Sequence, residues 1–375
     1  MKSNWKKVKL GEVCNILDNL RIPITASNRT KGKYPYYGAN GIQDKVADYI
    51  FDDELVLLAE DGGNFGSKEK PIAYRVSGKC WVNNHAHVLK EKDEKTLDID
   101  YLCYSLMFYD LTNYINGATR QKLTQTAMKK IHLFLPPLQE QKEIVGILDK
   151  LNNIIKKYKQ QLEKLDELIK SKFNEMFGDP IDNTKEWKKC ILEKVCDVRD
   201  GTHDSPKYIA YGNHALITSK NIKNGEFDFS VLNYITDEDY DKINKRSKVD
   251  VGDMLMPMIG TIGNPIIIKE EVSFAIKNVA LFKFNKQNKL KNIYLQFLLK
   301  SNFFEYIMQQ EIKGGTQKFF ALKNIRKMVV PIPPIELQNK FAEFVKKIEN
   351  LKEKFQKQIN LYTELLNKKM DEYFN

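Results

Sequence analysis

The strongest constraint on how this chain can fold is that its sequence is written twice. Residues 5–14 are echoed at residues 187–196, since each stretch starts with Trp-Lys-Lys and ends with Val-Cys. Further along, the proline pair at 136–137 is answered by one at 333–334. The tryptophans are offset by 187 − 5 = 182 residues and the prolines by 333 − 136 = 197, so the second copy is 15 residues longer. The repeat predicts two structural units built on one plan.

A long helix is predicted after each proline pair, because proline is well tolerated in the first turn of a helix. Apolar residues then recur four and three positions apart, which is typical of the seam of a coiled coil. The two seams consist of Ile144, Leu148, Leu151, Ile155, Tyr158, Leu162, Leu165 and Ile169, and of Phe341, Val345, Ile348, Phe355, Ile359, Tyr362 and Leu366. Neither small domain could bury so long a seam, so we expect the two helices to pack against each other.

We therefore predict an α+β fold, with two mixed α/β domains related by pseudo-twofold symmetry and joined by two long antiparallel coiled-coil helices. The predicted boundaries are 1–137 for the first domain, 138–177 for the first spacer helix, 178–334 for the second domain and 335–375 for the second spacer helix. Such a chain carries two matched domains at a fixed separation, which suits one face of duplex DNA.

The composition is compatible with a nucleic-acid partner. The formal net charge is +11 and the lysines are spread along the chain, a pattern that favours polyanions but also fits a merely soluble, lysine-rich protein. The five cysteines are odd in number and form no Cys-x-x-Cys pair, so neither disulfides nor a zinc site is expected. The first residues lack the apolar core of a signal peptide, and no apolar run reaches the roughly 18 residues of a membrane span. We expect a cytoplasmic protein with no membrane partner.

Motifs for catalysis are incomplete. The nearest match to an adenine-methyltransferase loop, at residues 264–267, lacks the second proline and the aromatic residue that hold a flipped base. The glycines at 260–263 have the wrong spacing for a cofactor loop, and no phosphate-binding Gly-x-x-x-x-Gly-Lys-Ser/Thr motif occurs. Glu-x-Lys strings at 140–142 and 311–313 are expected by chance in a chain rich in Glu and Lys. We therefore predict a binding protein with no catalytic residues, cofactor or metal.

The repeated organisation of the chain and several of its short motifs resemble one specific protein family. A variable domain followed by a long helix, twice over, with Pro-Pro-Leu-x-Glu-Gln at the start of the first helix, resembles the specificity subunits of type I restriction-modification systems, and the resemblance covers the whole chain. Further segments resemble recurrent motifs of that family's target-recognition domains: residues 34–42, 81–88, 200–208 and 252–255. The second helix departs from the pattern, with Ile-Glu-Leu-Gln at 335–338. The resemblance implies a non-catalytic subunit that binds double-stranded DNA and two methyltransferase subunits, with endonuclease-translocase subunits in the full complex.

Two other functions stay open. A specificity subunit of a BcgI-like system, in which one partner polypeptide both methylates and cleaves, would have nearly the same sequence. The second alternative is a coiled-coil adaptor whose globular halves bind proteins. The basic charge and the duplicated polar turns described next argue against it.

The best candidates for DNA contact are two glycine turns. Glycine lets the backbone approach a phosphate, while Thr, Gln, Lys and Arg supply hydrogen-bond donors. These turns contribute Gly117, Thr119, Arg120, Gln121 and Lys122, and Gly314, Gly315, Thr316, Gln317 and Lys318. The alternative is an ordinary turn before a helix.

Other polar residues in the two domains are further candidates for contact with DNA. They are Tyr37, Asn40, Asn83, Asn84, His85, His203 and Lys207. His85 and His87 have the alternation of a strand, but no further ligand cluster accompanies them, so a hydrogen-bonding role is favoured over metal binding. Because the two domains differ in length and in their loops, we expect the two DNA half-sites to differ in sequence.

Overall fold

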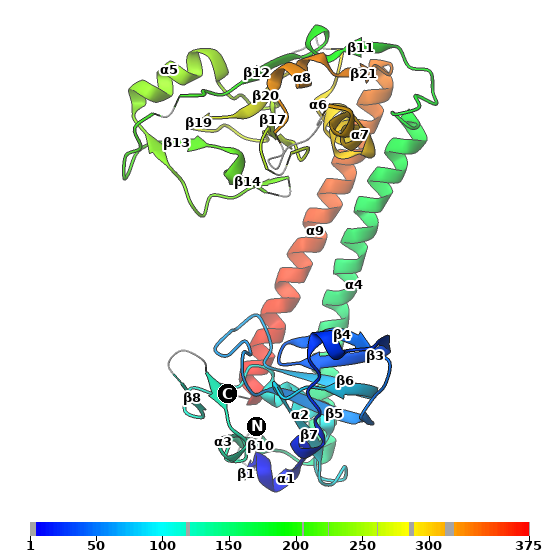
Figure 1. Ribbon diagram of the computed structural model, residues 1–375, viewed down its shortest axis with the longest axis vertical. Coiled ribbons are helices and arrows are strands. Elements are labelled where there is room, and N and C mark those ends of the chain that lie inside the picture. Colours follow the sequence, from blue (N-terminus) through cyan, green and yellow to red (C-terminus); the bar gives the residue numbers. More distant parts are fainter. Residues whose placement is uncertain are drawn as a thin grey trace. The chain divides into compact units, whose positions relative to one another are not determined.

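The computed structural model describes residues 5–117, 121–204, 206–223, 225–260, 262–284, 289–311 and 319–374 (Figure 1). The chain divides into two compact units. Unit 1 comprises Met1–Lys159 and Gln356–Asn375, and unit 2 comprises Gln160–Phe355. Each unit therefore contains one globular domain together with a part of each long helix.

Unit 1 is built on a six-stranded sheet in the order β2-β7-β5-β6-β3-β4. These strands are β2 (Cys14–Ile16), β3 (Lys31–Gly38), β4 (Gly41–Val46), β5 (Phe51–Ala59), β6 (Ala73–Val82) and β7 (Ala86–Glu91). Side chains alternate between the faces of a strand, so Val56 and Leu58 of β5 pack on one face while Leu55 and Leu57 pack on the other. The first face is covered by the helix α2 (Ile99–Met107) and by the start of the first long helix.

Short elements complete unit 1. Two strand pairs, β1 (Lys6–Lys9) with β10 (His132–Leu135) and β8 (Ile115–Asn116) with β9 (Lys122–Leu123), lie outside the main sheet. The remaining helices are α1 (Leu10–Val13), η2 (Asp18–Leu20), η3 (Ala26–Asn28) and α3 (Gln125–Met128).

Unit 2 has a four-stranded sheet in the order β12-β20-β17-β18 and a three-stranded sheet in the order β16-β13-β19. The strands of the two sheets are β12 (Asp197–Asp200), β13 (His214–Ile217), β16 (Tyr234–Ile235), β17 (Met254–Pro257), β18 (Ile266–Ile267), β19 (Phe274–Ile276) and β20 (Val279–Lys283). Two strand pairs lie outside them, β11 (Lys189–Ile191) with β21 (Val329–Pro331) and β14 (Ile222–Lys223) with β15 (Glu226–Phe227). The helices are η4 (Leu192–Lys194), η5 (Ser219–Asn221), α5 (Asp237–Ser247), α6 (Asn292–Lys300), α7 (Asn302–Glu311) and α8 (Leu322–Lys327).

Two long helices, α4 (Leu138–Phe177) and α9 (Ile335–Phe374), confirm the predicted helical part of the fold. Within unit 1 the Tyr158 and Tyr362 rings stack with centroids 6.2 Å apart, and within unit 2 Lys352 Nζ lies 2.8 Å from Asp166 Oδ1. Positions rise along α4 as they fall along α9, so the helices are antiparallel. All the predicted seam residues are buried or half-buried. Among helices in the described part of the chain, none is both long and apolar enough to cross a membrane.

A buried glutamine fixes the start of each long helix to its own domain. Gln141 is fully buried, accepts a hydrogen bond from the backbone N–H of Asp98 and donates to the carbonyl oxygens of Thr96 and Pro136. Gln338 repeats this in unit 2, where it accepts from the Lys291 N–H and donates to the carbonyl oxygens of Lys289 and Pro333. Residues 335–338 differ from the family's helix motif, but the glutamine of the motif makes the same three hydrogen bonds in both copies.

The C-terminal end of each long helix packs on an equivalent tyrosine. In unit 2 the Phe177 ring lies 4.8 Å from the Tyr294 ring, and in unit 1 the Phe374 ring lies 5.4 Å from that of Tyr101. Gly178 ends α4 with a φ of 74°, a left-handed conformation that glycine adopts without a steric penalty. Each unit thus takes in the beginning of one long helix and the end of the other.

Candidate nucleic-acid interface

In unit 1, three distant segments that contain predicted contact residues meet around one turn, at residues 60–62. The Asn40 side chain donates to the Gly62 carbonyl oxygen over 2.9 Å. The Glu60 N–H donates to the His85 carbonyl oxygen, and Asp61 forms a β-bridge with Lys122. Asn40, Asn84 and Lys122 are exposed, so the turn forms the centre of a polar surface, called the unit-1 polar face below.

Asp61 and Asn83 fix the position of His85. The imidazole Nδ1 of His85 lies 2.6 Å from Asp61 Oδ1, and its backbone N–H donates to Asn83 Oδ1 over 2.8 Å. Asn83 is buried and also donates to Gln43 Oε1, which places it behind the surface while the His85 side chain remains 37% exposed. Asp61 lies 24 residues from His85 in the sequence and was not among the predicted residues.

Lys122 lies at the edge of a buried ionic network. Its Nζ is 3.0 Å from Glu60 Oε1, and Arg21 Nη1 is 2.7 Å from Glu60 Oε2. His87 has Nδ1 2.6 Å from Asp18 Oδ2 and Nε2 2.8 Å from the Leu123 carbonyl oxygen. These bonds attach the short strand β9, in which Lys122 is exposed and Leu123 is buried, to the core of unit 1.

Burial and ionic contacts act in opposite directions on the two carboxylates of this network. Burial by itself would raise the pKa of Asp18, but the hydrogen bond and charge of His87, with the charge of Arg21, hold that pKa below its usual range. Burial opposes ionisation of Glu60 as well, and bonds from Arg21 and Lys122 lower the pKa of Glu60 overall. Both groups are therefore ionised at neutral pH.

Oxygen and nitrogen atoms of Asp18, Glu60 and His87 lie within 4.8 Å of one another, a spacing compatible with a metal ion. The Arg21 guanidinium, however, contacts both carboxylates, with Nη2 3.5 Å from Asp18 Oδ2. A permanently charged arginine repels a second cation at this distance. The cluster is accordingly an ion-pair network.

Unit 2 holds its predicted histidine differently. His203 Nε2 lies 2.7 Å from Asp200 Oδ2, and its Nδ1 lies 2.8 Å from Asn278 Oδ1. Asp200 is buried and forms a second ion pair with Arg246. Both ring nitrogens of His203 are therefore engaged. Lys207, four residues on, is exposed.

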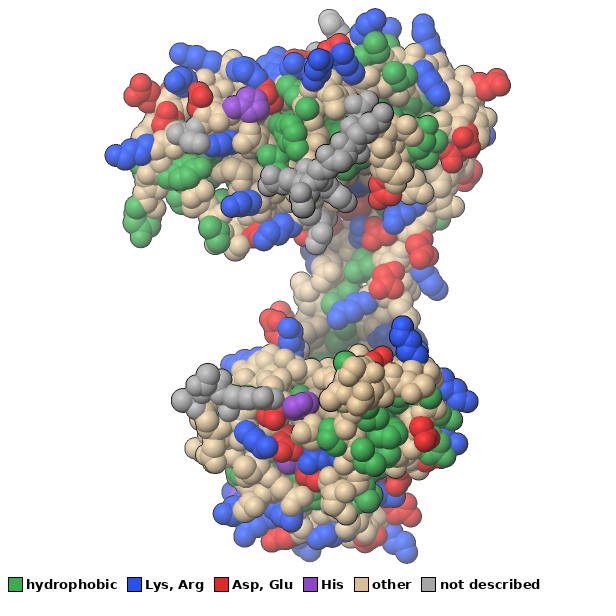
Figure 2. Space-filling model, in the orientation of Figure 1, with side chains coloured by type: hydrophobic (Ala, Val, Ile, Leu, Met, Phe, Trp, Pro, Cys, Tyr) green, Lys and Arg blue, Asp and Glu red, His purple; other side chains and the backbone are tan. Residues whose placement is uncertain are grey.

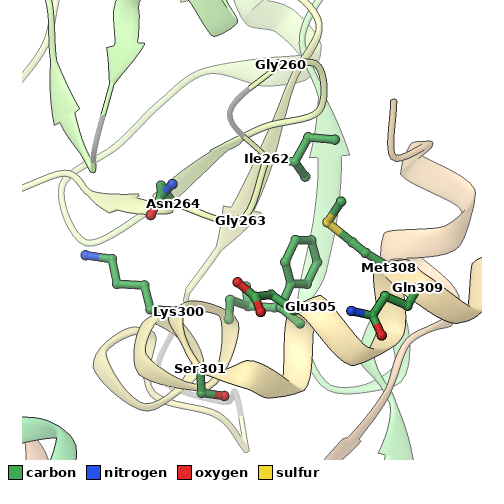
Figure 3. Close-up of a pocket in the computed structure, with 11 residues that line it drawn as sticks. Gly260, Ile262, Gly263, Asn264, Lys300, Ser301, Glu305, Met308 and Gln309 are labelled. Carbon is green, nitrogen blue, oxygen red and sulfur yellow. The ribbon is translucent and has the colours of Figure 1, made fainter. Parts of the chain in front are cut away.

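A cavity of about 730 Å³ opens in unit 2 beside Gly260 and Gly263, which follow β17 (Figure 3). Gly260 and Gly263 have φ values of 78° and 91°, and a Cβ on Gly263 would come within 2.7 Å of the Phe304 ring. Burial lowers the pKa of Lys300, which lines the cavity with Glu305 and Asn264. Figure 3 shows these three side chains on the wall of the cavity, next to the turn.

The remaining predicted residues are placed as follows. Gly117 has a φ of 105°, as expected of a glycine turn, and Gln121 is exposed. The Tyr37 ring is half-buried, 5.8 Å from the Tyr74 ring, and burial raises its pKa. The other predicted turn residues lie outside the described part of the chain: Thr119, Arg120, Gly314, Gly315, Thr316, Gln317 and Lys318.

Basic and acidic side chains are mixed on the visible surface, and the cysteines are free. Figure 2 shows Lys and Arg side chains scattered over the visible face of each unit, with Asp and Glu side chains among them. All five cysteines are free, and burial raises the pKa of Cys14, Cys80, Cys103 and Cys196 to about 12. These four are buried thiols that are protonated at neutral pH, so they lack the character of a nucleophile.

Comparisons with solved structures show the fold. The S subunit of a type I restriction-modification system from M. genitalium matches with a TM-score of 0.60 at 13% identity, over 99% of this chain and 96% of that one. A chain from a type I R-M system, described for its complex assembly and conformational transition, matches with a TM-score of 0.59 at 16% identity, over 100% of this chain and 98% of that one.

Comparisons of sequence show the family. The model for the type I restriction modification DNA specificity domain matches residues 2–165 and 184–361. The type I restriction enzyme specificity subunit S.HindORF215P of Haemophilus influenzae is 32% identical over 386 residues, which cover 96% of this chain and 94% of that protein. The MjaVIII specificity subunit of Methanocaldococcus jannaschii is 24% identical, over 93% of this chain and 87% of that protein. The resemblance found in the sequence is confirmed, and the chain belongs to the family of type I restriction-modification specificity subunits.

Proposed function

We propose that this chain is the non-catalytic subunit that selects the DNA site of a type I restriction-modification complex in the cytoplasm. Each globular domain reads one half of a bipartite double-stranded site, and partner subunits methylate adenine and cut the DNA. The proposed reading domains are residues 1–137 and 178–334, and the long helices between them act as spacers.

The convergence on the unit-1 polar face is the observation that carries this proposal. Asn40, Asn84 and Lys122 come from three separate segments, are exposed and surround one turn. Asn can bond adenine with two hydrogen bonds in the major groove, and Lys can bond guanine or a phosphate. Such a set of donors and acceptors around the turn that follows β5 is suited to reading base edges.

Two equivalent partner sites are supported by the long helices. Leu168 on α4 and Leu365 on α9 occupy equivalent positions, 30 residues after the first residue of each helix, and are 46% and 38% exposed. Each is a single exposed leucine, so what supports a repeated contact is its recurrence at the equivalent position of the second helix, not the apolar area. A repeated interface is suited to two copies of one partner, for which we propose two methyltransferase subunits, with endonuclease-translocase subunits in the full complex.

Methylome sequencing of a host with and without the gene tests the proposal. We expect an asymmetric bipartite methyladenine motif that disappears with the gene and returns with a plasmid copy. The purified chain alone should show no methyltransferase or nuclease activity. A methylome that is unchanged by deletion of an expressed gene, or methylation by the isolated chain free of partner, contradicts the proposal.

A further inference from the structure

We propose that His85, held by Asp61, reads an exocyclic amino group of adenine or cytosine in the half-site of unit 1. The inference rests on the proposed function and assigns one atom of the unit-1 polar face to one chemical feature of a base. The atom is Nε2 of the His85 ring.

Asp61 determines which ring nitrogen of His85 carries the proton. An ionised carboxylate can only accept hydrogen bonds, so the 2.6 Å contact between Asp61 Oδ1 and His85 Nδ1 places the proton on Nδ1. In the neutral imidazole Nε2 is then left with a lone pair and acts as an acceptor. The buried Asn83 restrains the same residue from its backbone side.

The acceptor is accessible and has no protein partner among the residues that the structure describes. The His85 side chain is 37% exposed, whereas that of Asp61 is 13% exposed. No described Ser, Thr or Cys side chain hydrogen-bonds to Nε2, so the pair is not arranged as a hydrolase dyad beside a nucleophile. A ligand that donates a hydrogen can therefore complete the ring's bonding.

The surroundings of His85 favour a base edge as that ligand. Asn84, the preceding residue, is exposed. Lys122 is 50% exposed and lies beside Asp61, with which it forms a β-bridge. In the major groove only the amino groups of adenine and cytosine are donors, while guanine and thymine present acceptors at the matching positions. A neutral acceptor restrained by a second residue distinguishes these two classes of base.

Among the described residues of unit 2, the position equivalent to His85 offers no free acceptor. The position that matches His85 is Asn278, whose Oδ1 already lies 2.8 Å from His203 Nδ1. The other ring nitrogen of His203 is bonded to Asp200. The amino-group contact is therefore expected in one half-site only.

The test removes single amino groups from DNA bound to the assembled complex with its methyltransferase partner. In duplexes that carry the methylated motif, each adenine is replaced in turn by purine and each cytosine by 2-pyrimidinone, which deletes the amino group alone. With the unaltered protein we expect at least one position in one half-site where this deletion weakens binding roughly 3- to 10-fold more than it does with His85→Ala, as for loss of one hydrogen bond. With His85→Ala the same deletion should have no effect.

Two further variants guard the interpretation. Asp61→Asn keeps the shape of the side chain but can accept or donate, so we expect the cost of the amino deletion to fall at the same position. His132→Ala, a half-buried histidine on β10 of unit 1, should leave it unchanged. Unaltered discrimination in the other half-site shows that each variant complex is folded.

The outcomes separate the inference from the proposed function. A complex of the unaltered chain that binds DNA without sequence preference overturns the proposed function, and this inference with it. A specific complex in which every amino deletion costs the same with and without His85 overturns the inference alone.

Discussion

The backbones of units 1 and 2 follow the same strand register around the turns that begin at Glu60 and at Met258, but the side chains at these turns differ in chemical character. In unit 1, β5 pairs with β7 as β17 pairs with β20 in unit 2, and the bridge between residues 61 and 122 is matched by one between 259 and 319. This register sets polar residues against largely apolar counterparts: Glu60, Asp61, His85, His87 and Lys122 in unit 1 against Met258, Ile259, Asn278, Ala280 and Phe319 in unit 2.

The contacts that attach the long helices differ far less. Gln141 and Gln338 make the same three hydrogen bonds, and Tyr101 and Tyr294 each receive a phenylalanine from a helix end. The repeat has therefore kept its helix attachments and changed its exposed turns. That division is what the proposed function requires, since it assigns a different half-site to each unit of one common scaffold.

The largest effect is expected where the helix attachments are unequal. Phe177 is 3% exposed and packs on Phe173, Tyr294 and Phe341, so Phe177→Ala should destabilise unit 2 by about 3–5 kcal/mol. Phe374 is only half-buried, and Phe374→Ala should destabilise unit 1 by about 1–2 kcal/mol. Urea unfolding followed by tryptophan fluorescence measures both, since Trp187 is the one tryptophan of unit 2. Equal losses would show that the two attachments are equivalent.

The glutamine attachments should be equal. Leucine in place of either Gln141 or Gln338 removes the side-chain partner of one backbone N–H and of two carbonyl oxygens, at a cost of about 2–3 kcal/mol in each unit. Gln139→Leu is the matched control, because Gln139 is exposed and should cost less than about 0.5 kcal/mol. The unfolding midpoints of the three variants report these energies, and a loss confined to one of the two buried positions contradicts the equivalence.

A smaller effect separates the two turns in DNA binding. Lys122→Ala should weaken binding by the complex and reduce the slope of log affinity against log salt by about one unit, as for one lost phosphate contact. Phe319→Ala at the equivalent position of unit 2 should leave that slope unchanged. Lys207→Ala serves as the positive comparison in unit 2. A salt titration by fluorescence anisotropy measures all three, and an unchanged slope in Lys122→Ala indicates an ordinary turn.

The smallest effect concerns acid. The pKa values of Asp18 and Glu60 are lowered in the folded state, so their stabilisation is fully present above the unfolded carboxyl values near pH 4 and is lost as pH falls through the folded values. Asp18→Asn should therefore be less stable at pH 7 and lose less further stability on acidification. Glu163→Gln, on the exposed side of α4, is the control. A parallel acid profile for Asp18→Asn and the unaltered chain would falsify this account of the network.

The helices could be predicted from the sequence because their signal is local and periodic. The four-three spacing from Ile144 to Ile169 was sufficient to indicate α4, and the proline pair to indicate its start. The repeat predicted two units built on one plan, and the matching helices α2 and α6, which contain Tyr101 and Tyr294, follow that plan.

The interior of the candidate site could not be predicted in the same way. Asp61 reaches His85, and Glu60 reaches Arg21 and Lys122, only through a strand register that no local pattern specifies. Gln141 has the polarity of a surface residue, and its complete burial follows from contacts with residues more than 40 positions away. The residue types indicated which side chains could form hydrogen bonds or ion pairs, whereas the residues that they bond to became known only from the tertiary structure.

Methylation mapping with one unit altered at a time tests most directly whether the two units read different half-sites. Asn84→Ala with Lys122→Ala alters unit 1, and His203→Ala with Lys207→Ala alters unit 2. For each gene, expressed with its partners in a deletion host, the methylated motif is determined by sequencing. We predict an asymmetric bipartite motif for the unaltered chain, relaxed in one half by the first pair and in the other half by the second. A palindromic motif, or the same half relaxed by both pairs, would contradict the account.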